Sequence, residues 1–326
     1  MSTVIEVEGL SKRYGDVQAV DGVDFAVRRG ELFGFLGPNG AGKTTTINIL
    51  TGLARPDAGS ILIDGINCTN NPKAAQHLIG VVPDESNLYP ELTGFENLCF
   101  CAALYGMPRR QREARARELL TTFGLADAAD RRFGGYSRGM KRKLTIAAGI
   151  IHDPPVLFLD EPTTGIDVAG ARQIRQLIAG LHKAGTTIFL TTHYIEEAER
   201  LCERIAFIVH GKIVRTDAIT DLMQPIRDRH VLLLSVSHAE AGIVDALLAA
   251  CPGCTVTNPA PTDIRIESRE PIRVAPLVRL LEERHVEVAE ARQLRPSLED
   301  IFVQITGMEA DAMRKEKAAG KAGGAA

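Results

Sequence analysis

The stretch Gly37–Thr44, which reads GPNGAGKT, decides the fold of this 326-residue chain. It matches the phosphate-binding pattern G-x-x-x-x-G-K-[ST], in which glycines let successive backbone N–H groups turn inward toward phosphate oxygens. The residues that we expect to bind the phosphates of a nucleotide are Gly37, Pro38, Asn39, Gly40, Ala41, Gly42, Lys43, Thr44 and Thr45.

The flanking sequence gives the motif its structural setting. The apolar run Leu32–Leu36 before the motif is typical of a strand, and the segment Thr45–Leu53 after it has helical spacing. A helix that begins at the loop adds partial positive charge toward a bound phosphate. Lys43 then supplies a point charge for the β- and γ-phosphates of ATP, and the hydroxyl of Thr44 is a suitable ligand for Mg²⁺.

A pair of acids ends the apolar run Val156–Glu161, which reads VLFLDE. A buried strand should not end in adjacent carboxylates unless a cation lies beside them. We expect Asp160 to hold Mg²⁺, directly or through water. Glu161 is expected to orient or deprotonate the water that attacks the γ-phosphate.

A histidine follows the next expected strand, Thr187–Leu190, in the sequence TTHY. Ligands of open α/β sheets bind at the carboxyl ends of the strands, and His193 lies at that edge with the two acids. We predict that His193 senses the γ-phosphate and helps to position the water. The expected catalytic residues are therefore Glu161, His193 and Lys43.

Strand and helix signals alternate along the first two thirds of the chain, which predicts an α/β fold. The expected strands are Val23–Val27, Leu32–Leu36, Ser60–Asp64, Ile79–Val82, Val156–Leu159, Thr187–Leu190 and Ile205–Val209. The expected helices are the segment after Gly42, Arg109–Thr122, Ser137–Ile151 and Ala169–Ala184.

The rhythm breaks around Met223–Arg229, where we place a domain boundary. Residues 1–224 form the expected ATP-binding domain, and residues 225–307 form a small α+β domain of short strands and helices. Residues 308–326 are rich in Ala, Lys and Gly without apolar periodicity, so this tail is expected to be disordered.

Composition narrows the setting of the protein. The chain has 45% hydrophobic and 24% charged residues and a net charge of −3, which argues against a nucleic-acid-binding surface over the whole protein. The opening MSTVIEVEGL lacks the features of a secretory leader, and no apolar run is as long as a membrane span. We expect a cytoplasmic protein with free thiols, in which Cys251 and Cys254 flank a plain turn.

One further segment carries a family resemblance. Tyr136–Met140, which reads YSRGM and is followed by KRKL, is similar to the LSGGQ signature of the nucleotide-binding subunits of ABC transporters. Ser137 and Gly139 occupy its two most important positions. The resemblance implies that this helix end binds the γ-phosphate of ATP held by an opposite subunit, so that ATP lies between two chains arranged head-to-tail.

Other segments agree with the same family. Tyr14 in KRYG resembles the aromatic residue that stacks on adenine, and Asp167 in TTGID resembles the acid that links the two sites of the dimer. The sequence Pro296–Gly307 resembles the closing segment of drug- and polymer-type exporters. The region Leu92–Gly106 lies where the family docks its membrane subunit, although core packing explains many of its residues equally well.

The resemblance implies an architecture and a set of partners. It implies a P-loop NTPase core of ABC type with an antiparallel β-subdomain and a helical subdomain at about residues 90–152. It further implies MgATP as cofactor and a homodimer or a paired nucleotide-binding subunit. Integral membrane permease subunits of the ABC-2 type would hold the protein at the inner face of the cell membrane, with no nucleic acid expected.

Two residues depart from the family pattern. Arg138 stands where the signature usually has the first of its two glycines. Asp84, in VVPDE, stands where the family usually has Gln, which reaches Mg²⁺ and relays to the membrane subunit. Asp is shorter and anionic but remains an oxygen ligand. We expect Asp84 to keep the metal role and to alter the coupling.

Two alternative functions remain open from the sequence. The first is a soluble ATPase of the same superfamily that acts on nucleic acid or the ribosome. The segment between Thr44 and Ser137 is too short for the zinc modules or coiled coils of the repair members, and the chain has a single core. The second is a regulatory ATP-binding module without turnover, which Glu161 and His193 oppose and Asp84 keeps open. The cargo stays undetermined.

Overall fold

The computed structural model describes residues 2–226, 229–238, 242–294 and 297–307. The chain divides into two compact units. The first unit comprises the chain up to Ile219 together with the residues from Phe302 onward. The second unit is Thr220–Ile301. The return of Phe302 to the first unit was not expected from the sequence. The tail predicted over 308–326, and Pro296 of the closing segment, lie outside the described residues.

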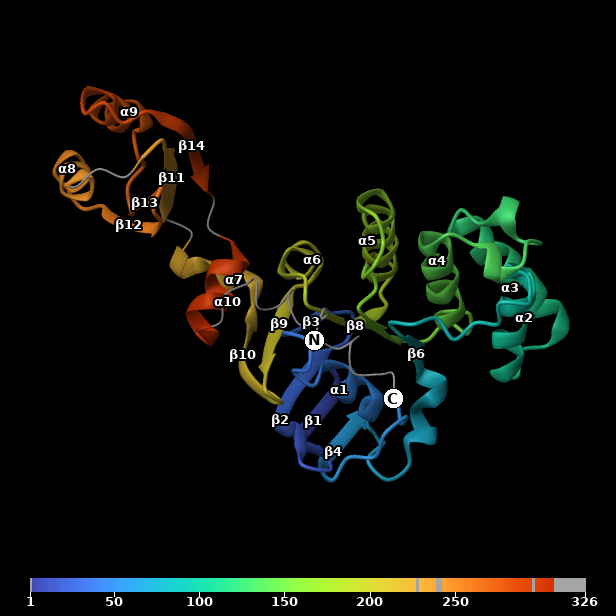
Figure 1. Ribbon diagram of the computed structural model, residues 1–326. Coiled ribbons are helices and arrows are strands. Elements are labelled where there is room, and N and C mark those ends of the chain that lie inside the picture. Colours follow the sequence, from blue (N-terminus) through green and yellow to red (C-terminus); the bar gives the residue numbers. More distant parts are fainter. Residues whose placement is uncertain (1, 227–228, 239–241, 295–296, 308–326) are drawn as a thin grey trace, which may run out of the picture. The chain divides into compact units, whose positions relative to one another are not determined.

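The first unit is built on a six-stranded sheet with the order β10-β9-β3-β8-β7-β6 (Figure 1). Its strands are β3 (Leu32–Leu36), β6 (Ile79–Val82), β7 (Val156–Asp160), β8 (Thr187–Thr192), β9 (Arg204–Val209) and β10 (Lys212–Ala218). Five strands run parallel, and β10 pairs antiparallel with β9 at one edge. Every residue of β3, β7 and β8 is buried, as expected for strands covered on both faces.

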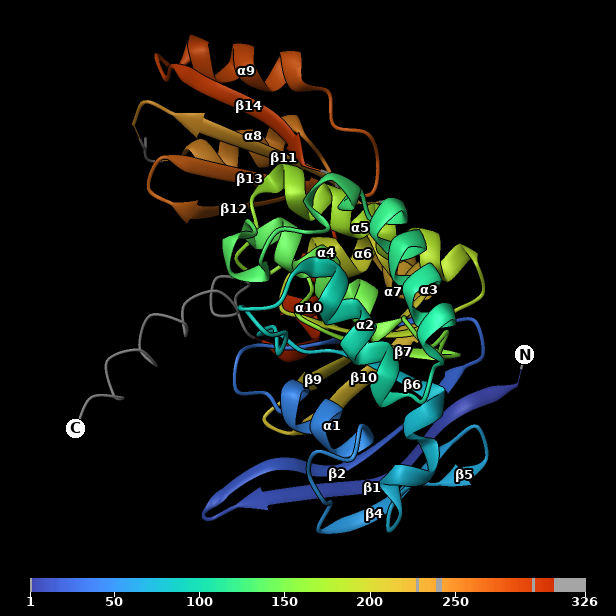
Figure 2. The same cartoon turned by 90° about the vertical axis from the view of Figure 1, so that its right-hand side faces the viewer.

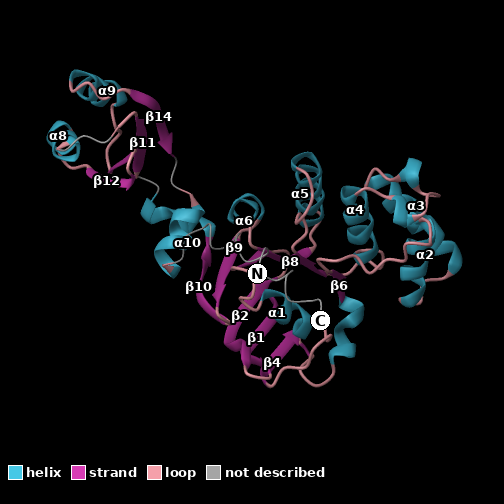
Figure 3. Ribbon diagram, viewed as in Figure 1, coloured by secondary structure: helices cyan, strands magenta, loops and turns pink. Residues whose placement is uncertain are grey.

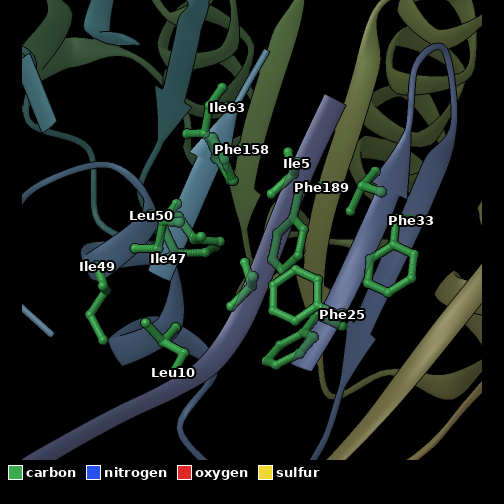
Figure 4. Close-up of a cluster of buried hydrophobic side chains, with 14 of the residues drawn as sticks. Ile5, Leu10, Phe25, Phe33, Ile47, Ile49, Leu50, Ile63, Phe158 and Phe189 are labelled. Atoms are coloured by element: carbon green, nitrogen blue, oxygen red, sulfur yellow. The ribbon is translucent and has the colours of Figure 1, made fainter. Parts of the chain in front are cut away.

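A second, antiparallel sheet has the order β2-β1-β4-β5. Its strands are β1 (Thr3–Tyr14), β2 (Val17–Arg28), β4 (Ala58–Ile63) and β5 (Ile66–Asn67). A core of buried side chains joins this sheet to the central one (Figure 4). The ring of Phe25 on β2 has its centroid 5.9 Å from that of Phe33 and 5.7 Å from that of Phe189. This packing holds β3 and β8 in place, and the segments that directly follow these two strands carry the site.

Helices occupy the connections between the strands (Figure 3). Those of the first unit before Ile219 are α1 (Lys43–Leu50), α2 (Gly94–Leu104), α3 (Arg109–Thr122), α4 (Arg138–Gly149), α5 (Val168–Lys183) and α6 (Ile195–Leu201). Helix α10 (Leu298–Thr306) carries Phe302 back into this unit. Helix α2 packs against both α3 and α4, which forms a helical group between β6 and β7. In the part of the chain that the structure describes, no helix combines the length and apolar character needed to cross a bilayer.

The second unit has the element order β-α-β-β-α-β (Figure 2). After the short helix α7 (Ile219–Met223) come β11 (His230–Val236), α8 (Ile243–Ala250), β12 (Thr255–Ala260), β13 (Asp263–Ser268), α9 (Val274–Glu283) and β14 (Val288–Leu294). The strand order β12-β13-β11-β14, with every neighbour antiparallel, is the ferredoxin-like arrangement. Helices α8 and α9 supply the apolar residues that cover its core.

Two cysteines of this unit correct a sequence-based expectation. Cys251 and Cys254 form a disulfide, so the predictions of free thiols and of a plain turn were wrong for this pair. The backbone N–H of Cys254 donates to the carbonyl of Cys251 over 3.1 Å at the end of α8. This turn brings the two Cα atoms to 5.6 Å, a separation that a disulfide bridges. The remaining cysteines, Cys68, Cys99, Cys101 and Cys202, are free.

Candidate active site

The phosphate-binding loop joins β3 to α1 and depends on three of its glycines. A Cβ atom on Gly37 would lie 2.1 Å from the carbonyl oxygen of Ile208, and one on Gly42 would lie 2.3 Å from that of Ala19. Gly40 and Gly42 also have φ values of 78° and 106°, which other residues rarely adopt. The glycines of the pattern are therefore required for two reasons: neighbouring carbonyl oxygens leave no room for a Cβ atom, and the backbone adopts positive φ angles.

Two side chains of this loop show that it suits a phosphate. Lys43 is 5% exposed, and its Nζ atom donates to the carbonyl oxygens of Gly37 at 2.7 Å and Pro38 at 3.1 Å. Among the described residues, the Nδ2 atom of Asn39 is buried and has no hydrogen-bond partner. A buried donor of this kind is costly unless a ligand satisfies it, and phosphate oxygens would do so.

The expected magnesium ligands are all hard oxygen donors. Asp160 ends β7, is 4% exposed, and accepts a short hydrogen bond from the hydroxyl of Thr191. Thr44 is exposed in the first turn of α1, beside the phosphate-binding loop. The side chain of Asp84 is 41% exposed in the loop after β6. Hydroxyl and carboxylate oxygens are the ligands that Mg²⁺ prefers, so this donor set fits the metal.

Glu161 lies at the centre of a buried polar cluster. Its Oε2 atom is 2.6 Å from Nδ1 of His193 and accepts a hydrogen bond of 2.9 Å from Thr164, while its Oε1 atom is 3.4 Å from Nζ of Lys43. The structure thus brings together the three predicted catalytic residues. Glu161 has a φ of 49°, which is rare for a non-glycine residue and typical of functional sites.

The electrostatics of this cluster favour an ionised Glu161. Burial by itself raises the pKa of Glu161, but the hydrogen bond to His193 and the charges of Lys43 and His193 outweigh burial. The pKa of Glu161 therefore lies below its ordinary value. Glu161 is available as a carboxylate at neutral pH, which a residue that orients or deprotonates water requires.

The signature segment and the segment after β7 both present helix ends. Ser137 is exposed at the N-cap of α4, where its hydroxyl accepts a hydrogen bond of 3.3 Å from the N–H of Met140. Asp167 is the N-cap of α5 and accepts one of 2.8 Å from the N–H of Gly170. Arg138 donates to the carbonyl of Gly165 over 3.3 Å, so it ties these two segments together.

Several predicted residues lie apart from the catalytic cluster. Tyr14, at the end of β1, is 49% exposed, and its ring centroid is 5.3 Å from Nζ of Lys12. Ser137 and Asp167 accept hydrogen bonds from the backbone of their own helices. Gly139 lies in the first turn of α4.

One buried residue at the site was missed by the sequence analysis. Arg142 on α4 is 7% exposed and donates to the backbone carbonyls of Pro83, Asp84 and Glu161. A sequence signal exists, because Arg142 lies three residues before Thr145 and so shares the buried face of α4. The sequence did not single out Arg142, because it is one of three consecutive basic residues.

The fold and this site define a P-loop ATPase: a glycine-rich loop between a central strand and a helix, with acids and a histidine at the same sheet edge. The family model described as "ABC transporter" matches residues 20–164. The daunorubicin resistance ATP-binding protein DrrA3 of Streptomyces coeruleorubidus is 38% identical over 94% of this chain and 96% of its own length. The linearmycin resistance ATP-binding protein LnrL of Bacillus subtilis is 35% identical over 93% of this chain and 98% of its own.

Solved structures agree with these relatives. An ATP-binding subunit of an ABC transporter superposes with a TM-score of 0.62 and 31% identity, covering 68% of this chain and 93% of its own. A dimeric ATP-binding cassette in a post-hydrolysis state, bound to ADP and Pi, has a TM-score of 0.61 and 28% identity, with coverages of 66% and 98%. The chain belongs to the ABC transporter family, among the ATP-binding subunits of its exporters, and it binds and hydrolyses ATP. The soluble nucleic-acid and ribosome alternative is not favoured.

Proposed function

We propose that two copies of this chain close head-to-tail on two MgATP and drive export through separate membrane subunits of the ABC-2 type. The observation that carries this proposal is the buried cluster of Lys43, Glu161 and His193 at the carboxyl edge of the parallel sheet. The exposed N-cap Ser137 supports the dimer, because a helix N-terminus attracts the phosphate of a second copy. The similar cassette solved in a post-hydrolysis state is also dimeric.

The chain's own residues have distinct roles in hydrolysis. The backbone amides of residues 37–45, Lys43 and Asn39 hold the triphosphate. Glu161 accepts a hydrogen bond from the attacking water or takes its proton, and His193 orients Glu161 and contacts the γ-phosphate. Tyr14 stacks on adenine, and Asp167 links the two sites. Most of the reduction in the barrier comes from positioning and electrostatics, as is general for phosphoryl transfer.

Magnesium would be held by the oxygen donors of Thr44, Asp160 and Asp84 together with the phosphates. When bound, the ion neutralises charge that develops on the phosphate oxygens. Burial of Asp160 and its hydrogen bond from Thr191 fix the orientation of that carboxylate before the nucleotide binds. Asp84 brings an additional negative charge to the loop after β6.

The surface of the helical group offers a docking place for the membrane partner. Leu104 is 71% exposed, and Tyr105, Tyr89 and Phe100 are exposed around it, with the last two in edge-to-face contact at 5.2 Å. We propose that a segment of the permease covers these residues and holds the protein at the cytoplasmic face of the membrane. The names of the relatives, which refer to resistance to daunorubicin and linearmycin, support a small organic cargo.

The dimer can be tested with purified protein. Glu161→Gln should form a dimer on addition of MgATP, measured by size-exclusion chromatography with light scattering. Adding Ser137→Arg should abolish the dimer but leave ATP binding intact, because the bulky side chain blocks only the helix end. Ser237→Arg in the second unit is the matched control. A dimer that survives Ser137→Arg contradicts the head-to-tail arrangement.

A further inference from the structure

Arg142 joins three separate segments of the first unit. From α4, its Nη1 atom donates to the carbonyl oxygen of Pro83 and its Nη2 atom to that of Asp84, both over 2.6 Å. Nη2 also lies 3.4 Å from the carbonyl oxygen of Glu161. One buried guanidinium therefore connects the signature helix, the loop after β6 and the turn after β7. A planar group with five donors can serve three acceptors at once, whereas an ammonium group cannot match that geometry.

The same guanidinium lies within a group of carboxylates. Its Nη2 atom is 3.6 Å from Oδ1 of Asp84. Burial lowers the pKa of Arg142, and the negative charges around it, first that of Asp84 and then those of Asp160, Glu161 and Glu197, oppose this effect. A buried charge is tolerated only when opposite charges and hydrogen bonds compensate it. Asp84 and Arg142 therefore form a compensated pair beside the proposed metal site.

Arg142 also contacts the backbone of a residue in an unfavourable conformation. Glu161 has a φ of 49°, and such a conformation persists only when its surroundings hold it. The N–H of Glu161 donates to the carbonyl of Thr191 over 3.1 Å, and its carbonyl accepts from the N–H of Thr164 over 3.2 Å. The guanidinium of Arg142 is the charged member of this set of contacts.

We propose that Arg142 is a positioning residue for ATP hydrolysis, which neutralises Asp84 and holds the Asp84 loop and the backbone of Glu161 in register with the signature helix. The proposal rests on the functions proposed above for Asp84 and Glu161. Loss of Arg142 removes the cation 3.6 Å from the carboxylate of Asp84 and releases two loops at once. Loss of the Asp84 charge removes the first of the carboxylates that compensate this buried cation, beside the proposed metal site.

A double-mutant cycle tests the charge pairing. The full-length proteins compared are wild type, Asp84→Asn, Arg142→Gln and the double variant, with Lys143→Gln on the same helix as the control. The readout is the Mg²⁺ concentration that gives half-maximal binding of a fluorescent ATP analogue. Asp84→Asn should raise this concentration and Arg142→Gln should lower it, each by about threefold, a size typical of coupled neighbours. In the Asp84→Asn background, Arg142→Gln should have a clearly smaller effect, because only the interactions of Arg142 with the charges of Asp160, Glu161 and Glu197 remain.

The results distinguish the charge pairing of Arg142 with Asp84 from the metal role of Asp84. If Arg142→Gln changes the Mg²⁺ midpoint by the same factor whether residue 84 is Asp or Asn, Arg142 does not act through Asp84 and the proposal is overturned. If Asp84→Asn leaves the midpoint at the wild-type value, the proposed metal role of Asp84 fails, and the charge pairing with it. The tether to Glu161 is judged by a second measurement.

Hydrogen exchange in protein without nucleotide tests that tether. Arg142→Gln should speed exchange of the amides of residues 84–86, 161, 163 and 164 severalfold, while α4 keeps its wild-type protection. Arg142→Lys keeps the charge but not the three-way hydrogen bonding. It should therefore show a normal Mg²⁺ midpoint together with faster exchange in the same loops and a lower kcat. Unchanged exchange in both loops, or faster exchange spread along α4, would overturn the tether.

Discussion

The Nδ1 atom of His193 lies 2.6 Å from the Oε2 atom of Glu161, and both side chains are almost completely buried. This contact joins the end of β8 to the turn after β7. It also sets the protonation of Glu161, because the hydrogen bond and the charge of His193 act against the cost of burial. The pair is therefore best regarded as one unit that holds a carboxylate ready at neutral pH.

Replacing His193 should shift the pH dependence of ATP hydrolysis. His193→Ala removes the main influence that lowers the pKa of Glu161, while the burial that raises it remains. The carboxylate then protonates at a higher pH, so the acidic limb of kcat/KM should move upward. We also expect kcat to fall by about 10²–10⁴-fold. His238→Ala, an exposed histidine of the second unit, is the control, and an unmoved acidic limb would count against the pairing.

Glu161→Gln should retain ATP binding and lose turnover. The amide keeps the size of the side chain but cannot take a proton from water, so kcat should fall by about 10²-fold or more. Single-turnover hydrolysis and nucleotide binding, measured on the same preparation, separate the two steps. Hydrolysis at the wild-type rate would show that another group activates the water.

Lys43→Ala should abolish high-affinity ATP binding. The ammonium group is buried beside the carbonyls of Gly37 and Pro38, and its loss removes the charge that the β- and γ-phosphates would meet. We expect affinity to fall by about 100-fold, equivalent to about 2.7 kcal/mol. Isothermal titration with MgATP measures the change. Lys183→Ala, on the exposed end of α5, should bind like wild type, and equal binding by both variants would refute the phosphate site.

The adenine platform can be tested at Tyr14. A base stacked on an aromatic ring contributes about 1–3 kcal/mol, so Tyr14→Ala should weaken ATP binding by about tenfold or more. Tyr14→Phe keeps the ring and should bind within about twofold of wild type. The affinity for tripolyphosphate, measured by competition, should be unaffected by both changes, because tripolyphosphate lacks a base. Equal losses for Ala and Phe would point to the hydroxyl instead of the ring.

Glu197 should make stability depend on pH. It is 3% exposed, and burial raises its pKa, so the folded state holds this proton more tightly than the unfolded state. Its favourable contribution is present below the unfolded pKa of about 4.3 and is lost as pH rises through the folded value. Glu197→Gln should therefore raise the melting temperature more at pH 8 than at pH 6. Glu196→Gln, its exposed neighbour, controls for surface charge, and equal gains at both pH values would contradict the assignment.

The sequence was most informative where chemistry and local pattern coincide. The phosphate loop, the acids that end β7 and the histidine after β8 each form a short motif next to a fully buried strand. Parallel strands share a carboxyl edge, so three motifs that are far apart in the chain could be placed together from the sequence alone. The contact of Glu161 with Lys43 and His193 follows from that topology.

Other features carried weaker signals. Strand β1 was missed because several register shifts interrupt its pairing with β2, which breaks the alternation of buried and exposed residues. Strand β12 is mostly exposed and contains Pro259, as an edge strand can. Arg142 was missed for another reason: its acceptor Pro83 is 59 residues away in sequence, and no local pattern reports such a contact.

Phe302 has a consequence for dissecting the protein. Its ring is fully buried, with its centroid 5.4 Å from that of Phe207 on β9, so a residue that follows the whole second unit completes the core of the first. In polypeptide terms, Thr220–Ile301 is an insertion within the ATPase and not an appendage at its end. A chain that ends before residue 220 would lack the ring of Phe302, which would leave a cavity beside Phe207 on β9. Deleting Thr220–Ile301 and joining Ile219 to Phe302 through a short glycine linker would keep that core intact.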